Sequence, residues 1–174
     1  SPAIDLRIQL QTLGIGGKDG SVTSINGVLP GPLVRMREGE AVTLRVTNEL
    51  DEDSSIHWHG LLVPAEMDGV PGVSFPGIRP GETFTYQYPV KQSGTYWYHS
   101  HSGLQEQTGV YGPLIIDPRE PEPFRHDRDY VVLLSDWTFR DPYAVLHDLR
   151  TRPGYFNFQR RTLLDLPDEI SEKG

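Results

Sequence analysis

The sequence predicts an all-β protein, a sandwich or barrel of mostly antiparallel strands, on three observations. Apolar and polar residues alternate over several short stretches, as expected for strands that bury one face. Turn-forming residues separate these stretches, with 18 glycines and 15 prolines in 174 residues. Neither residue recurs at a fixed period, which excludes a collagen-like chain.

The alternation is clearest near the start of the chain. Over residues 4–13, one face carries Ile4, Leu6, Ile8 and Leu10, while polar side chains occupy the other face. A turn-rich break is expected directly after this strand, at 14–20.

Further strands are expected on both sides of a long loop. Residues 61–81 are too rich in proline for a central strand, and an ordered loop of this length is usually functional. Near the end, Asp141-Pro142 resembles a helix start, and residues 162–165 could begin a second helical turn. The other strands are expected at 22–25, 33–37, 41–48, 55–59, 82–88, 94–99, 112–117 and 130–135.

The composition restricts the partners and the kinds of site. The formal net charge is −8 and no basic block is present, so nucleic acid is not expected as a partner. The chain has no cysteine, which excludes disulfides and thiolate metal ligands within it. No run of about 20 apolar residues occurs, so no membrane span is expected. The first residues lack a basic region followed by an apolar core, and any signal peptide is expected to have been removed.

Two His-x-His motifs are the most distinctive feature of the sequence. Side chains two residues apart on a strand point to the same face, so each pair directs two imidazoles at one spot. Four imidazoles without a cysteine suit a transition metal, with copper, zinc, iron and nickel all chemically compatible. One pair alone would fit a surface motif equally well, but two pairs favour a built site. The paired histidines are four of the six in the chain: His57, His59, His99 and His101.

Residues 56–60, 67–78 and 94–101 resemble the first cupredoxin domain of the multicopper oxidases. The wording of 67–78 is similar to the copper-resistance branch of that family, the copper resistance protein A type. The resemblance covers most of residues 4–174. It implies a cupredoxin-like Greek-key β-sandwich or barrel with a short helical C-terminal extension. Residues 1–120 would form the domain core, and 121–174 a last strand and an extension toward a next domain.

The resemblance also implies roles for individual residues. In this family a three-copper cluster lies between the first and last domains, each of which supplies two His-x-His pairs. His57 would bind the type 2 copper, His59 and His99 one type 3 copper, and His101 the other type 3 copper. Asp68 would be the catalytic acid that relays protons toward the cluster, and the alternative is that Asp68 only shapes a turn with Gly69. His126 and His147 lack paired partners and are not expected to be ligands.

Part of the family's machinery is missing from these 174 residues. The type 1 copper site needs a cysteine, which the chain lacks, and the other two histidine pairs are absent. The resemblance therefore implies a partner: C-terminal cupredoxin domains of the same protein or of another chain. The face that bears the histidine pairs is accordingly expected to be apolar, with an aromatic rim of Trp58, Trp97 and Tyr98. It further implies O2 and either Cu(I) or a small phenol as reactants, and a periplasmic location.

Two functions follow from these observations. The first is the N-terminal domain of an oxidase that oxidises Cu(I) or phenols, reduces O2 to water and contributes to copper resistance. The second is a stand-alone cupredoxin-like module that binds or carries copper without catalysis. The long loop at 61–81 and the lack of a cysteine favour the oxidase, because a carrier would usually show a cysteine or methionine ligand.

Overall fold

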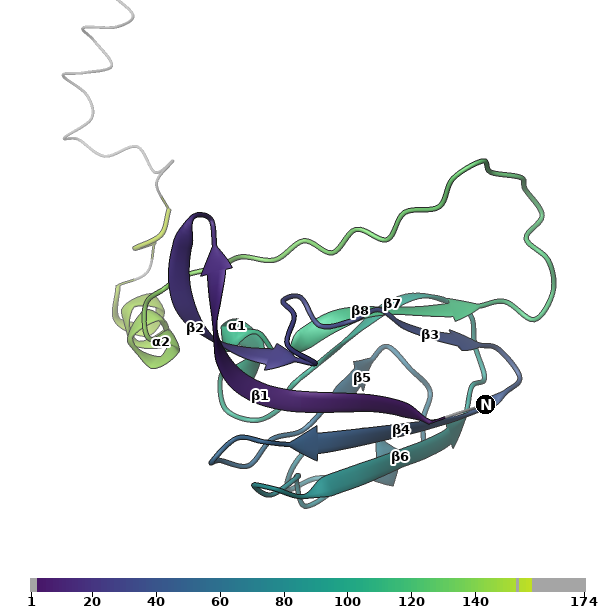
Figure 1. Cartoon of the computed structure of the whole chain (residues 1–174), viewed down its shortest axis with the longest axis horizontal. Coiled ribbons are helices and arrows are strands. Elements are labelled where there is room, and N and C mark those ends of the chain that lie inside the picture. The colour runs from purple at the N-terminus through teal and green to yellow at the C-terminus, as the bar shows by residue number, and fades with distance from the viewer. Residues whose placement is uncertain (1–2, 153, 158–174) are drawn as a thin grey trace, which may run out of the picture. The chain divides into compact units, whose positions relative to one another are not determined.

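The computed structural model describes residues 3–152 and 154–157, which fall into two compact units. The first unit ends at Phe139 and contains two four-stranded sheets, and the second begins at Arg140. The expected all-β architecture is confirmed (Figure 1).

The first sheet has the strand order β2-β1-β4-β6 and contains both parallel and antiparallel pairs. The parallel pair is β1 with β4, and the other two pairs are antiparallel. The break expected at 14–20 is wrong in extent. The first strand continues to Ile15 and the second begins at Lys18, so only Gly16 and Gly17 form the turn between them. Both glycines have positive φ, which suits the twist of a two-residue hairpin. The strands are β1 (Ile4–Ile15), β2 (Lys18–Ile25), β4 (Ala41–Asn48) and β6 (Thr83–Pro89).

The second sheet has the order β3-β8-β7-β5 and carries three of the four paired histidines, His57, His59 and His99. Its β3 and β8 are parallel, while β7 pairs antiparallel with β8 on one side and with β5 on the other. A one-turn helix, α1 (Gln105–Thr108), follows β7 and was not expected. The strands are β3 (Val34–Arg37), β5 (His57–His59), β7 (Gly94–His99) and β8 (Tyr111–Asp117).

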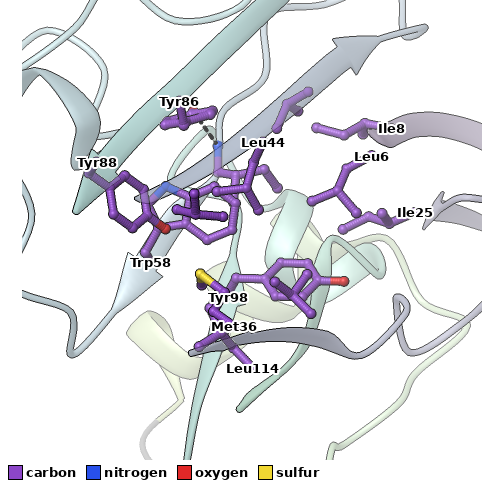
Figure 2. Packing of buried hydrophobic residues seen from close by; sticks show 14 of the residues in the cluster. Leu6, Ile8, Ile25, Met36, Leu44, Trp58, Tyr86, Tyr88, Tyr98 and Leu114 are labelled. Carbon is purple, nitrogen blue, oxygen red and sulfur yellow. Dashed lines mark hydrogen bonds between the residues drawn. The ribbon is translucent and has the colours of Figure 1, made fainter. Parts of the chain in front are cut away.

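Alternating side chains from both sheets form one hydrophobic core (Figure 2). Leu44 and Tyr86 contribute from the first sheet, and Trp58 and Tyr98 from the second, and all four are fully buried. The rings of Trp58 and Tyr86 meet edge to face with centroids 5.2 Å apart. Because Trp58 occupies the inward position of β5, the histidines on either side of it must face outward from the core.

The segment 61–81 is a loop, as expected, with one 3-10 turn, η1 (Ala65–Met67). Buried Phe75 and Ile78 anchor it to the core. The main chains of Ser54 and Ile78 exchange two hydrogen bonds of 3.0 and 2.8 Å, which hold the loop against the entrance to β5. The loop is thereby fixed beside the first histidine pair.

The strand expected at 130–135 is not formed, and this prediction is wrong for the chain as described. The segment lies in neither sheet, and Val132 and Leu134 are 76% and 89% exposed. A strand needs a neighbour that accepts and donates its main-chain hydrogen bonds, and none of the described strands supplies one.

The second unit contains the expected helix, α2 (Pro142–Thr151). The side chain of Asp141 accepts a 2.8 Å hydrogen bond from the Ala144 amide, so the predicted cap is confirmed. The carboxylate of Asp148 accepts hydrogen bonds from Arg140 and Arg152, which lower its pKa. The helical turn expected at 162–165 lies outside the described residues. In the described part of the chain, no helix is long and apolar enough to cross a membrane.

Candidate metal centre

The pairing of β5 with β7 places three of the four paired histidines on one face. In this antiparallel ladder His57 lies opposite His99, and His59 lies opposite Trp97. Directly opposed residues on neighbouring strands point to the same side, so the register alone brings these imidazoles together. The convergence expected from the i, i+2 spacing is therefore present.

The four imidazole rings cluster around His57. Its ring centroid lies 5.6 Å from that of His59, 5.3 Å from that of His99 and 5.5 Å from that of His101. One nitrogen from each of His57, His59 and His99 lies within 4.8 Å of the other two, a spacing that can hold a metal ion. The His101 ring adjoins this group, 6.0 Å from His99.

Main-chain carbonyl groups orient two of the rings. The Nδ1 atom of His57 lies 2.8 Å from the carbonyl oxygen of Asp68, and Nδ1 of His99 lies 2.8 Å from that of Ser100. A carbonyl oxygen only accepts, so each Nδ1 must carry the proton and donate it. The Nε2 lone pair of both rings is then free for a metal, as is usual for histidine ligands held by a second partner.

The closest approach in the cluster is 3.1 Å, between Nδ1 of His59 and Nε2 of His99. Metal–imidazole bonds of about 2.0 Å place two nitrogens on one ion about 3 Å apart. The spacing therefore fits two ligands of a single ion.

Burial and carboxylates set the electrostatics of the cluster. Burial lowers the pKa of His99, while the Ser100 carbonyl and the Glu106 carboxylate oppose this shift. The net effect favours the neutral imidazole, which is the form that binds metal. A carboxylate oxygen also lies beside Nδ1 of two of the rings. The Glu106 carboxylate is 3.0 Å from Nδ1 of His99, and the Asp68 carboxylate is 3.4 Å from Nδ1 of His57.

The donor set fits copper. Imidazole nitrogens are good ligands for copper, zinc, iron and nickel, and neutral rings with fixed tautomers are what each of these ions requires. Trp97 covers one side of the cluster, with its ring stacked on His99 at 4.2 Å. His126 and His147 are exposed, and neither belongs to a candidate metal-binding group within the described residues.

One expectation about the surface of this face is wrong. Trp58, Trp97 and Tyr98 were expected to form an aromatic rim around the histidines. Trp58 and Tyr98 are fully buried in the core, because they alternate with the histidines along β5 and β7. Only Trp97 shares the face of the histidine rings.

Gly69 allows the loop to reach His57. Its φ is +74°, and an added Cβ would lie 1.8 Å from the carbonyl oxygen of Ile56. No side chain fits in that space, so glycine is what lets the Asp68 carbonyl approach the His57 ring. The Asp68-Gly69 pair therefore shapes a turn and positions a candidate ligand at the same time.

We predict that Gly69→Ala will lower the free energy of unfolding by about 1–3 kcal/mol and weaken copper binding about 10–100-fold. Gly72→Ala is the matched control, since Gly72 has a φ of +75° but nothing within 4 Å of an added Cβ. Denaturant unfolding and a copper-competition assay would measure both effects. Equal effects from the two substitutions would show that the approach to Ile56 is unimportant.

Three residues of the site escaped sequence analysis. Glu106 contacts His99, buried Gln105 accepts hydrogen bonds from Ser54 and Ser100, and the hydroxyl of Ser55 accepts a 3.0 Å hydrogen bond from the His101 amide. Glu106 and Gln105 lie on α1, which is too short to produce a periodic pattern. Only their position directly after the second pair could have drawn attention to them.

Comparison with known proteins agrees with this geometry. The multicopper oxidase family model matches residues 8–121. The chain is 53% identical to copper resistance protein A of Pseudomonas syringae pv. tomato and 52% identical to that of Escherichia coli, each over 170 residues. Both alignments cover 98% of this chain and 28% of the relative. The chain thus spans little more than a quarter of the length of these relatives.

A solved structure of this family has a similar fold. The structure of a laccase mutant from B. aclada superimposes with a TM-score of 0.77 and 38% identity, covering 86% of this chain and 28% of the laccase. The two-sheet fold, the convergent histidine pairs and the sequence matches lead to one conclusion: the chain belongs to the multicopper oxidase family.

Proposed function

We propose that this chain is the first domain of a longer copper oxidase, in which its four histidines form half of a three-copper cluster. The observation that carries the proposal is the convergence of four imidazoles on one face, with two nitrogens 3.1 Å apart. When bound, the copper ions supply the electron transfer that reduces O2 to water. The chain's own residues bind these ions, fix their ligand orientation and supply protons.

The proposed ligand assignment follows the family resemblance, and one distance supports part of it. We assign His59 and His99 to one type 3 copper, because their nitrogens are spaced as two ligands of one ion. His57 is assigned to the type 2 copper and His101 to the second type 3 copper. Since the His57 ring lies within 5.6 Å of the other three, all the ions would be close neighbours.

Cu(I) or a small phenol is the proposed reductant, and the periplasm the proposed location. The support comes from the relatives named copper resistance protein A. Their alignments cover almost the whole of this chain at 52–54% identity. A type 1 copper would lie on another domain, because this chain has no cysteine to bind it.

The proposed partner is a further cupredoxin domain that carries the other histidine pairs. The exposed segment 130–135 supports a contact with such a domain, since its sequence is strand-like and Val132 and Leu134 are largely exposed. Nearby, the buried indole nitrogen of Trp137 has no hydrogen-bond acceptor among the described residues. A neighbouring strand could pair with 130–135, and an adjacent loop could satisfy Trp137.

Asp68 is the proposed source of protons. Reduction of O2 to water consumes protons, and the Nδ1 protons of His57 and His99 are already held by main-chain carbonyl oxygens. The Asp68 carboxylate is half-buried, with one oxygen 3.4 Å from Nδ1 of His57, so it reaches from solvent to the edge of the cluster. A carboxylate in that position can take a proton from water and pass it inward.

We predict that Asp68→Asn in the full-length oxidase will keep its copper but lower turnover about 100-fold or more. Copper should stay because His57 is held by the main-chain carbonyl of residue 68, which the substitution preserves. Asp68→Glu, which keeps the acid, is the control and should retain more activity. Copper analysis and the pH dependence of kcat would measure this, and an unchanged pH profile would leave Asp68 only its role in the turn.

Copper stoichiometry and O2 uptake separate an oxidase domain from a carrier. The oxidase proposal predicts that a longer polypeptide containing this domain binds several copper ions and consumes O2 with Cu(I) or a phenol. A carrier would bind a single ion and consume no O2. Binding of one ion without O2 uptake, in a full-length protein with all its cysteines and histidines, would overturn the proposal.

A further inference from the structure

A network of polar groups, centred on the buried side chain of Gln105, joins chain segments next to the two histidine pairs. Gln105, at the start of α1, is only 5% exposed and belongs to no strand. Its carboxamide oxygen accepts hydrogen bonds from Ser54 at 2.7 Å and from Ser100 at 3.0 Å. Its nitrogen donates to the Glu52 carboxylate at 2.9 Å and to the Asp53 carbonyl at 2.8 Å. All the hydrogen-bonding capacity of the side chain is used.

This network joins the segment before the first histidine pair to the segment around the second. Glu52, Asp53 and Ser54 lie before β5, whereas Ser100 lies between the two histidines of the second pair. The Gln105 side chain therefore connects the two segments. The β5–β7 ladder ends at His57 and His99, so its hydrogen bonds do not join the residues before His57 to those after His99.

His101 is the histidine that depends on this bridge. It lies two residues beyond the end of β7, so the ladder that aligns the other three histidines does not reach it. Its amide instead donates to the hydroxyl of Ser55 at 3.0 Å, and that hydroxyl lies 2.8 Å from the hydroxyl of Ser102. The Ser102 amide in turn donates to the hydroxyl of Ser100 at 3.0 Å, which completes the path to Gln105.

We propose that Gln105, acting through Ser100, Ser102 and Ser55, is the positioning residue that sets His101 against the other three histidines. Only a carboxamide meets the requirement, because the site needs two acceptor interactions and two donors together. A glutamate could not donate to the Glu52 carboxylate, and an apolar side chain would remove the acceptor of the buried Ser54 and Ser100 hydroxyls. The inference rests on the proposed metal site and adds the means by which its fourth ligand is placed.

The test follows each histidine ring by NMR while Cu(I), which is diamagnetic, is added to the 174-residue chain. In the wild-type chain the ring signals of all four paired histidines should shift. In Gln105→Met and in Ser55→Ala, the rings of His57, His59 and His99 should still respond, but the His101 response should require about 10–100-fold more Cu(I). Ser55→Ala removes a single hydroxyl, so it decides the question if Gln105→Met does not fold.

Thr108→Ala is the matched control. Thr108 is on the same helix, and its hydroxyl hydrogen-bonds to Thr23 at 3.0 Å and to the main-chain carbonyl of Gln105 at 3.1 Å, but to none of the serines that lead to His101. It should lower stability without a selective change at His101. An unchanged His101 response in a folded Gln105→Met or Ser55→Ala chain would overturn the positioning role, as would an equal loss at all four rings. No response of any ring in the wild-type chain would instead refute the metal site itself.

Discussion

The 174-residue chain loaded with copper is expected to consume no O2 above the rate of free copper, whether Cu(I) or a phenol is the reductant. Four imidazoles cannot fully ligate three copper ions, and without a cysteine there is no type 1 copper to accept electrons from a substrate. An oxygen electrode would measure the effect, with the full-length oxidase as the positive control. The expected difference is a complete loss of turnover.

Turnover by the isolated chain would contradict this expectation directly. Mass spectrometry of the assayed sample would show that no longer species is responsible. The result would mean that the four histidines form a complete catalytic site, and the proposed division of the cluster between two domains would be wrong.

His99→Ala is expected to have the largest effect of any single substitution on copper binding. His99 is buried against Trp97, its Nδ1 is fixed by the Ser100 carbonyl, and its Nε2 lies 3.1 Å from His59. Its loss removes a ligand and the partner that orients a second one. Copper affinity at this position should fall by more than the roughly 10–100-fold that loss of an outer partner costs.

The matched control is His147→Ala, which removes an exposed imidazole from α2. Equilibrium dialysis against a copper buffer would compare the two variants with the wild-type chain. The control should bind copper as the wild type does. Full copper occupancy in folded His99→Ala would exclude His99 as a ligand.

The sequence was most informative where local pattern and tertiary environment agree. Alternation located nearly all the strands, and the i, i+2 spacing of the histidines predicted their common face, because β7 and β5 pair in register. The pattern failed where a strand has few neighbours. Leu10 was expected to be buried with Leu6 and Ile8 but is 66% exposed, since β4 pairs only with residues 4–8 of β1.

Alternation within a segment cannot reveal whether a neighbouring strand exists. Residues 130–135 have the composition of a strand, yet the described chain offers them no partner.

The contacts that orient the histidines were also beyond sequence analysis. The Asp68 and Ser100 carbonyls act through the main chain, which carries no residue-specific signal, and Gln105 acts across residues that are distant in sequence.

X-ray absorption at the copper edge tests the central claim most directly, because it reports the ligands of the metal in this chain. The account predicts coordination by imidazole nitrogens in the wild-type chain, an unchanged spectrum after His126→Ala with His147→Ala, and loss of bound copper when both pairs are replaced. Copper that shows no imidazole ligands would contradict the account. So would copper that remains bound, with the same spectrum, after replacement of His57, His59, His99 and His101 by alanine.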